Sequence, residues 1–122
     1  MEANLLARAQ EDRRLESASV EHIVDWLQLT LGRKLTAFAS GIRSTSDLGR
    51  FAHGDSVPSP DTEVRLRNLY AVTWLLATRD GGGSAHTWLM EPNSELDGKA
   101  PAELLHDGAE PEKVWFAAAP VF

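Results

Sequence analysis

Apolar residues recur along most of this chain every three or four positions, the spacing that places them on one face of an α-helix. The clearest case is the segment 61–78, where one stripe holds Leu66, Leu69, Thr73 and Leu76. The segment 20–31 has the same periodicity, with Ser19 before it as a favourable N-cap and Gly32 after it as a terminator. No segment alternates apolar and polar residues over a useful length, so the sequence predicts an all-α protein.

Five shorter helices are expected, at about 33–40, 44–53, 84–90, 100–107 and 110–117. Ser59 or Asp61 is expected to cap the 61–78 helix, and Asn93 to cap the turn after Pro92. Three glycines within residues 80–84 cost about 1 kcal/mol each inside a helix, which predicts a hinge there. The predicted organisation is an N-terminal helical arm at 1–18, a helical domain at 19–79, the hinge at 80–84 and a second domain at 85–122. The arm is either a packed leading helix or a dimerisation element.

The pair of helices at 33–41 and 44–53 resembles a helix-turn-helix. Ala37 supplies the small residue where two helices touch, Gly41 supplies the glycine of the turn, and Leu48 and Phe51 form an inner face. Ser44-Thr45-Ser46-Asp47 has the spacing of a capping box. The outer face would read bases with Ser44, Thr45, Ser46, Arg50 and His53, while Arg33, Lys34 and Arg43 would hold the phosphate backbone. The alternative is a helical bundle whose outer face is only solvated.

The net charge of −6 counts against a protein that binds nucleic acid with its whole surface. The charges are unevenly distributed, however. Between residues 33 and 67, six basic side chains (Arg33, Lys34, Arg43, Arg50, Arg65 and Arg67) face four acidic ones (Asp47, Asp55, Asp61 and Glu63). After residue 80, seven carboxylates (Glu91, Glu95, Asp97, Glu103, Asp107, Glu110 and Glu112) face two lysines. The first half of the chain is therefore suited to binding phosphate groups, and the second half to binding a basic partner.

The segment 88–108 carries the most specific pattern in the chain. It runs Trp-Leu, two residues, Pro-Asn, then Leu, Gly, a second Pro, and ends in Leu-Leu-x-x-Gly. In this order and spacing, the segment resembles the C-terminal toxin-binding domain of Xre/ParS-like antitoxins, and the resemblance extends over residues 20–122. Most of the motif has a packing role, because its prolines and glycines start and stop short helices.

The resemblance implies an antitoxin that forms a homodimer, binds its own operator DNA and blocks a RES-domain toxin, an enzyme that consumes NAD. The second domain, 85–122, would be the toxin-binding domain, and its apolar end would occlude the toxin's active site. The toxin-contacting residues would be Trp88, Pro92, Asn93, Leu96, Trp115, Phe116, Val121 and Phe122. Trp115, Phe116 and Phe122 are the strongest candidates, since aromatic side chains dominate interface energetics. The tail is shorter and richer in alanine than this role requires.

Nothing in the sequence favours catalysis. The four histidines are scattered, the chain has no cysteine, and no metal or cofactor is expected. We expect a cytoplasmic protein, since no apolar run approaches the roughly 20 residues of a membrane helix and the polar N-terminus does not resemble a signal peptide. Two other functions remain open: a stand-alone helix-turn-helix regulator of bacterial or phage origin, or an interaction domain that kept this fold and lost DNA contact.

Overall fold

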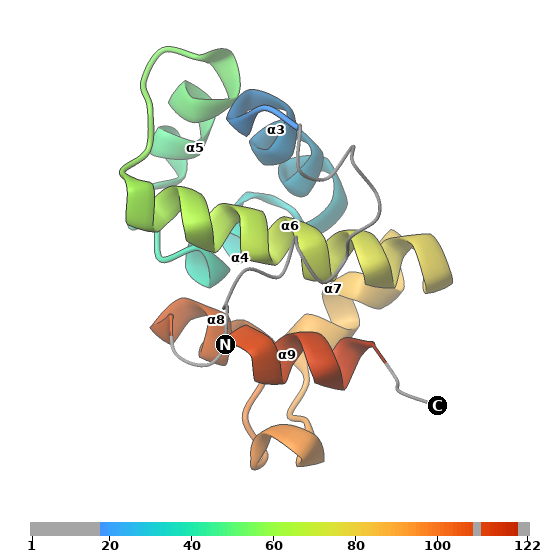
Figure 1. The fold of residues 1–122 in the computed structure, drawn as a ribbon. Coiled ribbons are helices and arrows are strands. Elements are labelled where there is room, and N and C mark those ends of the chain that lie inside the picture. The colour runs from blue at the N-terminus through green and yellow to red at the C-terminus, as the bar shows by residue number, and fades with distance from the viewer. Residues whose placement is uncertain (1–17, 109–110, 120–122) are drawn as a thin grey trace.

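The computed structural model describes residues 18–108 and 111–119. This part of the chain contains seven α-helices, one short 3-10 helix and no strand, which confirms the all-α prediction (Figure 1). The elements are α3 (Val20–Leu31), α4 (Arg33–Ala39), α5 (Thr45–His53), α6 (Pro60–Asp80), α7 (Gly82–Met90), η1 (Ser94–Leu96), α8 (Pro101–Asp107) and α9 (Pro111–Ala118). Apart from Ala18, the predicted arm at 1–18 lies outside the described residues.

Three of the elements, α3, α6 and η1, begin after side chains that were predicted to cap them. The hydroxyl of Ser19 accepts the His22 amide at 3.1 Å, and that of Ser59 accepts the Thr62 amide at 3.2 Å. The amide oxygen of Asn93 accepts from the Glu95 amide at 2.8 Å and so caps η1. Each cap satisfies an amide that has no partner within its own helix, which fixes the first turn locally.

Helix α6 is the centre of the molecule. In Figure 1 it crosses the middle, with α3 and α5 above it, α8 and α9 below it, and α4 and α7 behind it, where both contact α8. One hydrophobic core runs through all of these helices, and its fully buried members include Ile23, Leu27, Leu69, Leu89 and Val114. The segments 19–79 and 85–122 therefore share a single core.

The glycine-rich segment is a corner and not the five-residue hinge expected at 80–84. Only Gly81 is non-helical, with φ +96°, while Gly82 and Gly83 form the first turn of α7. At Gly82 a Cβ would lie 3.3 Å from Thr30 Cγ2, so the missing side chain lets α7 approach α3 closely. Close packing against α3 offsets the low helix propensity that predicted a flexible linker.

Candidate functional site

The unit formed by α4, the turn at 40–44 and α5 carries the residues predicted to contact DNA. Backbone hydrogen bonds close the turn: the Ile42 amide donates to the Ala37 carbonyl at 2.8 Å, and the Gly41 amide to the Phe38 carbonyl at 3.1 Å. Leu48 is fully buried, as expected for the inner face of α5. Phe51 is half-buried and packs against the core, so it also lies on this inner face.

The predicted DNA-contacting side chains lie at the surface of this unit. Seven of them are exposed (Arg33, Lys34, Arg43, Thr45, Ser46, Arg50 and His53), and Ser44 is half-buried. The hydroxyl of Ser44 caps α5 by accepting the Ser46 amide at 3.2 Å. The expected capping box is not formed, because Asp47 pairs with Arg50 on the next turn instead. His53 bonds within its own helix, where Nδ1 lies 2.8 Å from the Gly49 carbonyl.

Arg65 and Arg67, two of the six basic side chains between residues 33 and 67, are bound to other parts of the protein. Arg65 donates to the His106 carbonyl at 2.5 Å and pairs with Asp61 at 3.2 Å. Arg67 donates to the Ala18 carbonyl at 3.0 Å and pairs with Glu63 at 2.9 Å. The positive charge of the α4–α5 unit therefore comes from Arg33, Lys34, Arg43 and Arg50, against the single carboxylate of Asp47.

The predicted toxin-contacting residues divide into core and surface. Leu96 and Trp115 belong to the core, with Trp115 only 8% exposed, which corrects the prediction that they contact a partner. Helix α9 turns Val114, Trp115 and Ala118 inward, and this leaves Phe116 45% exposed. Trp88 and Asn93 are half-buried and Pro92 is exposed. Val121 and Phe122 lie outside the described residues.

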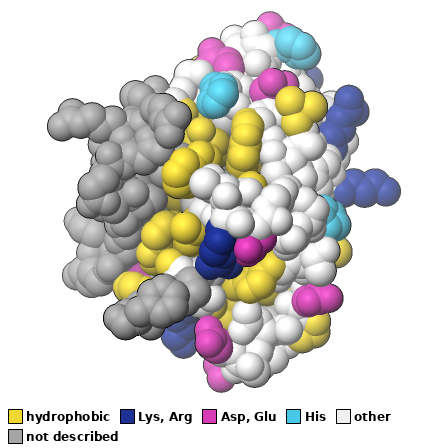
Figure 2. Space-filling view, turned by 90° about the vertical axis from the view of Figure 1, so that its right-hand side faces the viewer, with side chains coloured by type: hydrophobic (Ala, Val, Ile, Leu, Met, Phe, Trp, Pro, Cys, Tyr) yellow, Lys and Arg dark blue, Asp and Glu magenta, His cyan; other side chains and the backbone are white. Residues whose placement is uncertain are grey.

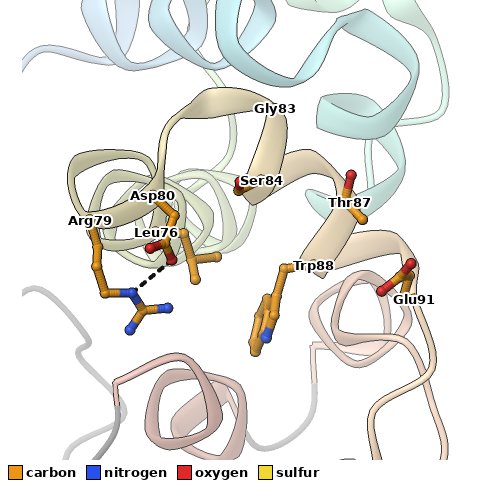
Figure 3. Close-up of a pocket in the computed structure, with 8 residues that line it drawn as sticks. All are labelled: Leu76, Arg79, Asp80, Gly83, Ser84, Thr87, Trp88 and Glu91. Atoms are coloured by element: carbon orange, nitrogen blue, oxygen red, sulfur yellow. Dashed lines mark hydrogen bonds and ion pairs between the residues drawn. The ribbon is translucent and has the colours of Figure 1, made fainter.

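A cleft of about 600 Å³ opens where α6 meets α7. Figure 3 shows Arg79 and Asp80 on one side, Thr87, Trp88 and Glu91 on the other, and Leu76 between them. Arg79 pairs with Asp80 at 2.8 Å and also donates to the Ala118 carbonyl at 2.8 Å, which ties the end of α9 to α6. The cleft thus combines an aromatic wall with an ion pair and one further carboxylate.

A second hollow, a groove of about 640 Å³, lies between α4, α7 and the start of α8. Most of its surface is apolar, and its lining residues are Lys34, Leu35, Phe38, His86, Met90, Pro92, Ala100, Ala102 and Glu103. Phe38 and Met90 leave about half of their side chains in solvent. Neither was predictable as a groove residue, because Phe38 shares an apolar face with the buried Leu35, and Met90 directly follows the apolar pair Trp88-Leu89.

The face at the right-hand side of Figure 1, where α6 ends, is shown in Figure 2. Hydrophobic side chains gather toward the middle of this face around a basic and an acidic side chain, and other charged side chains lie toward its edges. Within the described ranges, no three histidine or carboxylate side chains are grouped as metal ligands would be. None of the described helices is both long and apolar enough to cross a membrane.

Comparison of the chain with protein-family models, with curated proteins and with solved structures finds no match.

Proposed function

We propose that the protein is the antitoxin of a type II toxin–antitoxin pair, which binds and blocks a RES-type toxin and regulates its own operon through DNA binding. The observation that carries the proposal is the motif at 88–108, whose packing residues Leu96, Leu104 and Leu105 are buried while Pro92 stays exposed. A folded domain that docks a partner is expected to have such buried packing residues together with exposed residues for contact. The separation of a basic α4–α5 unit from an acidic C-terminal half supports it further.

DNA binding would use α5 as the recognition helix of a helix-turn-helix. Its exposed N-terminal residues Thr45 and Ser46 are hydrogen-bonding groups suited to base edges, and Arg50 lies one turn further along. Arg33, Lys34 and Arg43 would hold the phosphates. Releasing Arg50 from Asp47 costs little, because exposed ion pairs contribute at most about 1 kcal/mol.

Toxin binding would use the apolar side chains that the second half leaves in solvent. Phe116 on α9 and Met90 on α7 are the exposed large apolar residues of this half among those described. Around them the sequence places an excess of carboxylates, which suits a partner with a basic surface. Val121 and Phe122, which follow α9 in the sequence, are part of the proposed contact.

The proposal is tested by co-expressing the protein with the product of the adjacent gene. We expect the two to co-purify and the protein to suppress NAD loss in cells that express the neighbour. Phe116→Ala should weaken the complex, while Leu29→Ala serves as a control, because Leu29 is an 81% exposed apolar residue of α3, which belongs to the first half. Absence of a complex together with unchanged NAD loss would reject the toxin-binding part.

The DNA-binding part is tested separately, by titrating the protein against the duplex upstream of its own gene at two salt concentrations. Binding that weakens as salt rises is expected, because phosphate contacts release counterions. If DNA binds and no toxin partner is found, the protein is a stand-alone regulator. If a toxin is inhibited and no DNA binds at low salt, only the interaction domain has been retained.

A further inference from the structure

The guanidinium of Arg65 lies between the turn that joins α4 to α5 and the end of α8. It donates to the His106 carbonyl at 2.5 Å. A Cβ at Gly41 would lie 3.0 Å from its Nη1, and a Cβ at Gly108 only 2.5 Å from its Nη2. Both glycines have positive φ, +71° and +72°, so side chains are disfavoured there in any case. One side chain of α6 thus contacts two segments that are far apart in sequence.

His106 joins the same two segments a second time. Its Nδ1 donates to the Phe38 carbonyl at 2.8 Å, and this carbonyl also accepts the Gly41 amide that closes the turn. The rings of His106 and Phe38 are stacked, with centroids 4.3 Å apart. We call these five residues, Phe38, Gly41, Arg65, His106 and Gly108, the α4–α8 cluster.

We infer that Arg65 is a positioning residue for the α4–α5 turn: through Gly41 and His106 it fixes the turn against α8 and so sets the orientation of α5. The inference rests on the proposed function, in which α5 contacts DNA. Because α8 belongs to the half that carries the proposed partner surface, the α4–α8 cluster also links the two binding surfaces physically.

The hydrogen bonds of Arg65 are intramolecular. A positioning role for Arg65 therefore differs from direct binding of a DNA phosphate. Its side chain is 26% exposed, and its donors face Asp61 and the His106 carbonyl. Arg67 is a close control on the same helix. It is 23% exposed, pairs with Glu63 at the same i,i+4 spacing and also donates to one distant carbonyl, that of Ala18.

The first experiment compares hydrogen exchange in full-length Arg65→Ala and Arg67→Ala. We expect the amides of Gly41 and Ile42 to exchange roughly tenfold faster in Arg65→Ala, the change that the loss of one charge-assisted hydrogen bond produces. In Arg67→Ala these amides should exchange as in the wild type. Equal acceleration in both variants, or none in either, would overturn the inference.

If Arg65→Ala does not fold, Gly108→Ala displaces Arg65 without removing it. Gly98→Ala is its control, since Gly98 has φ +80° and no atom within 4 Å of a Cβ placed there. Faster exchange at Gly41 in Gly108→Ala alone supports the inference. The same change in both glycine variants contradicts it, because backbone strain alone would then explain the result.

The second experiment measures affinity for the upstream duplex over a range of salt concentrations. In Arg65→Ala the affinity should fall about tenfold with an unchanged salt slope, whereas loss of a phosphate contact would reduce the slope by about one. A reduced slope would overturn the inference. If the wild type does not bind the duplex, the DNA-binding part of the proposed function fails, and hydrogen exchange alone decides whether Arg65 positions the turn.

Discussion

The imidazole of His106 is stacked on the ring of Phe38, with the two planes 1° apart, and its Nδ1 donates to the Phe38 carbonyl. The two residues lie 68 positions apart in the sequence. This contact joins α4 to α8 at the edge of the apolar groove that Phe38 helps to line. It is one of the contacts between the two halves of the chain.

Replacing His106 with alanine removes the ring contact and the hydrogen bond together. We expect a loss of about 1–2 kcal/mol in the free energy of unfolding, measured by urea denaturation. His106→Phe keeps an aromatic ring and loses only the donor, so it should cost less. Equal losses in the two variants would show that the ring contact contributes nothing to stability.

Two fully buried threonines should respond in opposite directions to substitution by valine. The Thr36 hydroxyl donates toward the Gly32 carbonyl at 2.8 Å and the Leu27 carbonyl at 3.2 Å, so Thr36→Val should cost about 1–2 kcal/mol. The Thr73 hydroxyl has no hydrogen-bond partner within the described ranges, so Thr73→Val should stabilise the protein by about 1 kcal/mol. Thermal unfolding measures both, and destabilisation by Thr73→Val would contradict the account.

Substitutions of two neighbouring aromatic residues of α9 should have different effects, one on stability and the other on partner binding. Trp115 is buried, so Trp115→Ala should cost about 3–5 kcal/mol of folding free energy. Phe116 is half-exposed, so Phe116→Ala should cost only about 1 kcal/mol while weakening the toxin complex. Urea denaturation and co-purification give the two readouts. A folded Phe116→Ala variant that binds the toxin as the wild type does would remove this residue from the interface.

Arg50 and Asp47 should affect DNA binding in opposite ways. Arg50→Ala removes a proposed base-reading group and should cost about 1–3 kcal/mol of specific affinity. Asp47→Asn releases Arg50 from its ion pair and removes a negative charge from the proposed recognition helix, so affinity should rise. Fluorescence anisotropy with the upstream duplex measures both. Weaker binding by Asp47→Asn would indicate that Asp47 orients Arg50 productively.

The sequence by itself determined that the chain is helical and where several of its helices begin. Ser19, Ser59 and Asn93 were predictable as caps because a capping side chain bonds an amide two or three residues away. Such local geometry is encoded within a few residues. The spacing of apolar residues likewise predicted α6 as the longest helix and the burial of Leu66, Leu69, Thr73 and Leu76 on it.

Only the tertiary structure decided which chemically similar side chains serve the core and which remain at the surface. Trp115 and Phe116 are adjacent and both aromatic, yet the docking of α9 against α6 buries one and exposes the other. Arg65 and Arg67 counted as surface charge in the sequence, but both donate to carbonyls of distant segments. The glycine segment became a corner because α7 packs on α3. These outcomes depend on contacts between residues tens of positions apart, which local spacing and propensity do not encode.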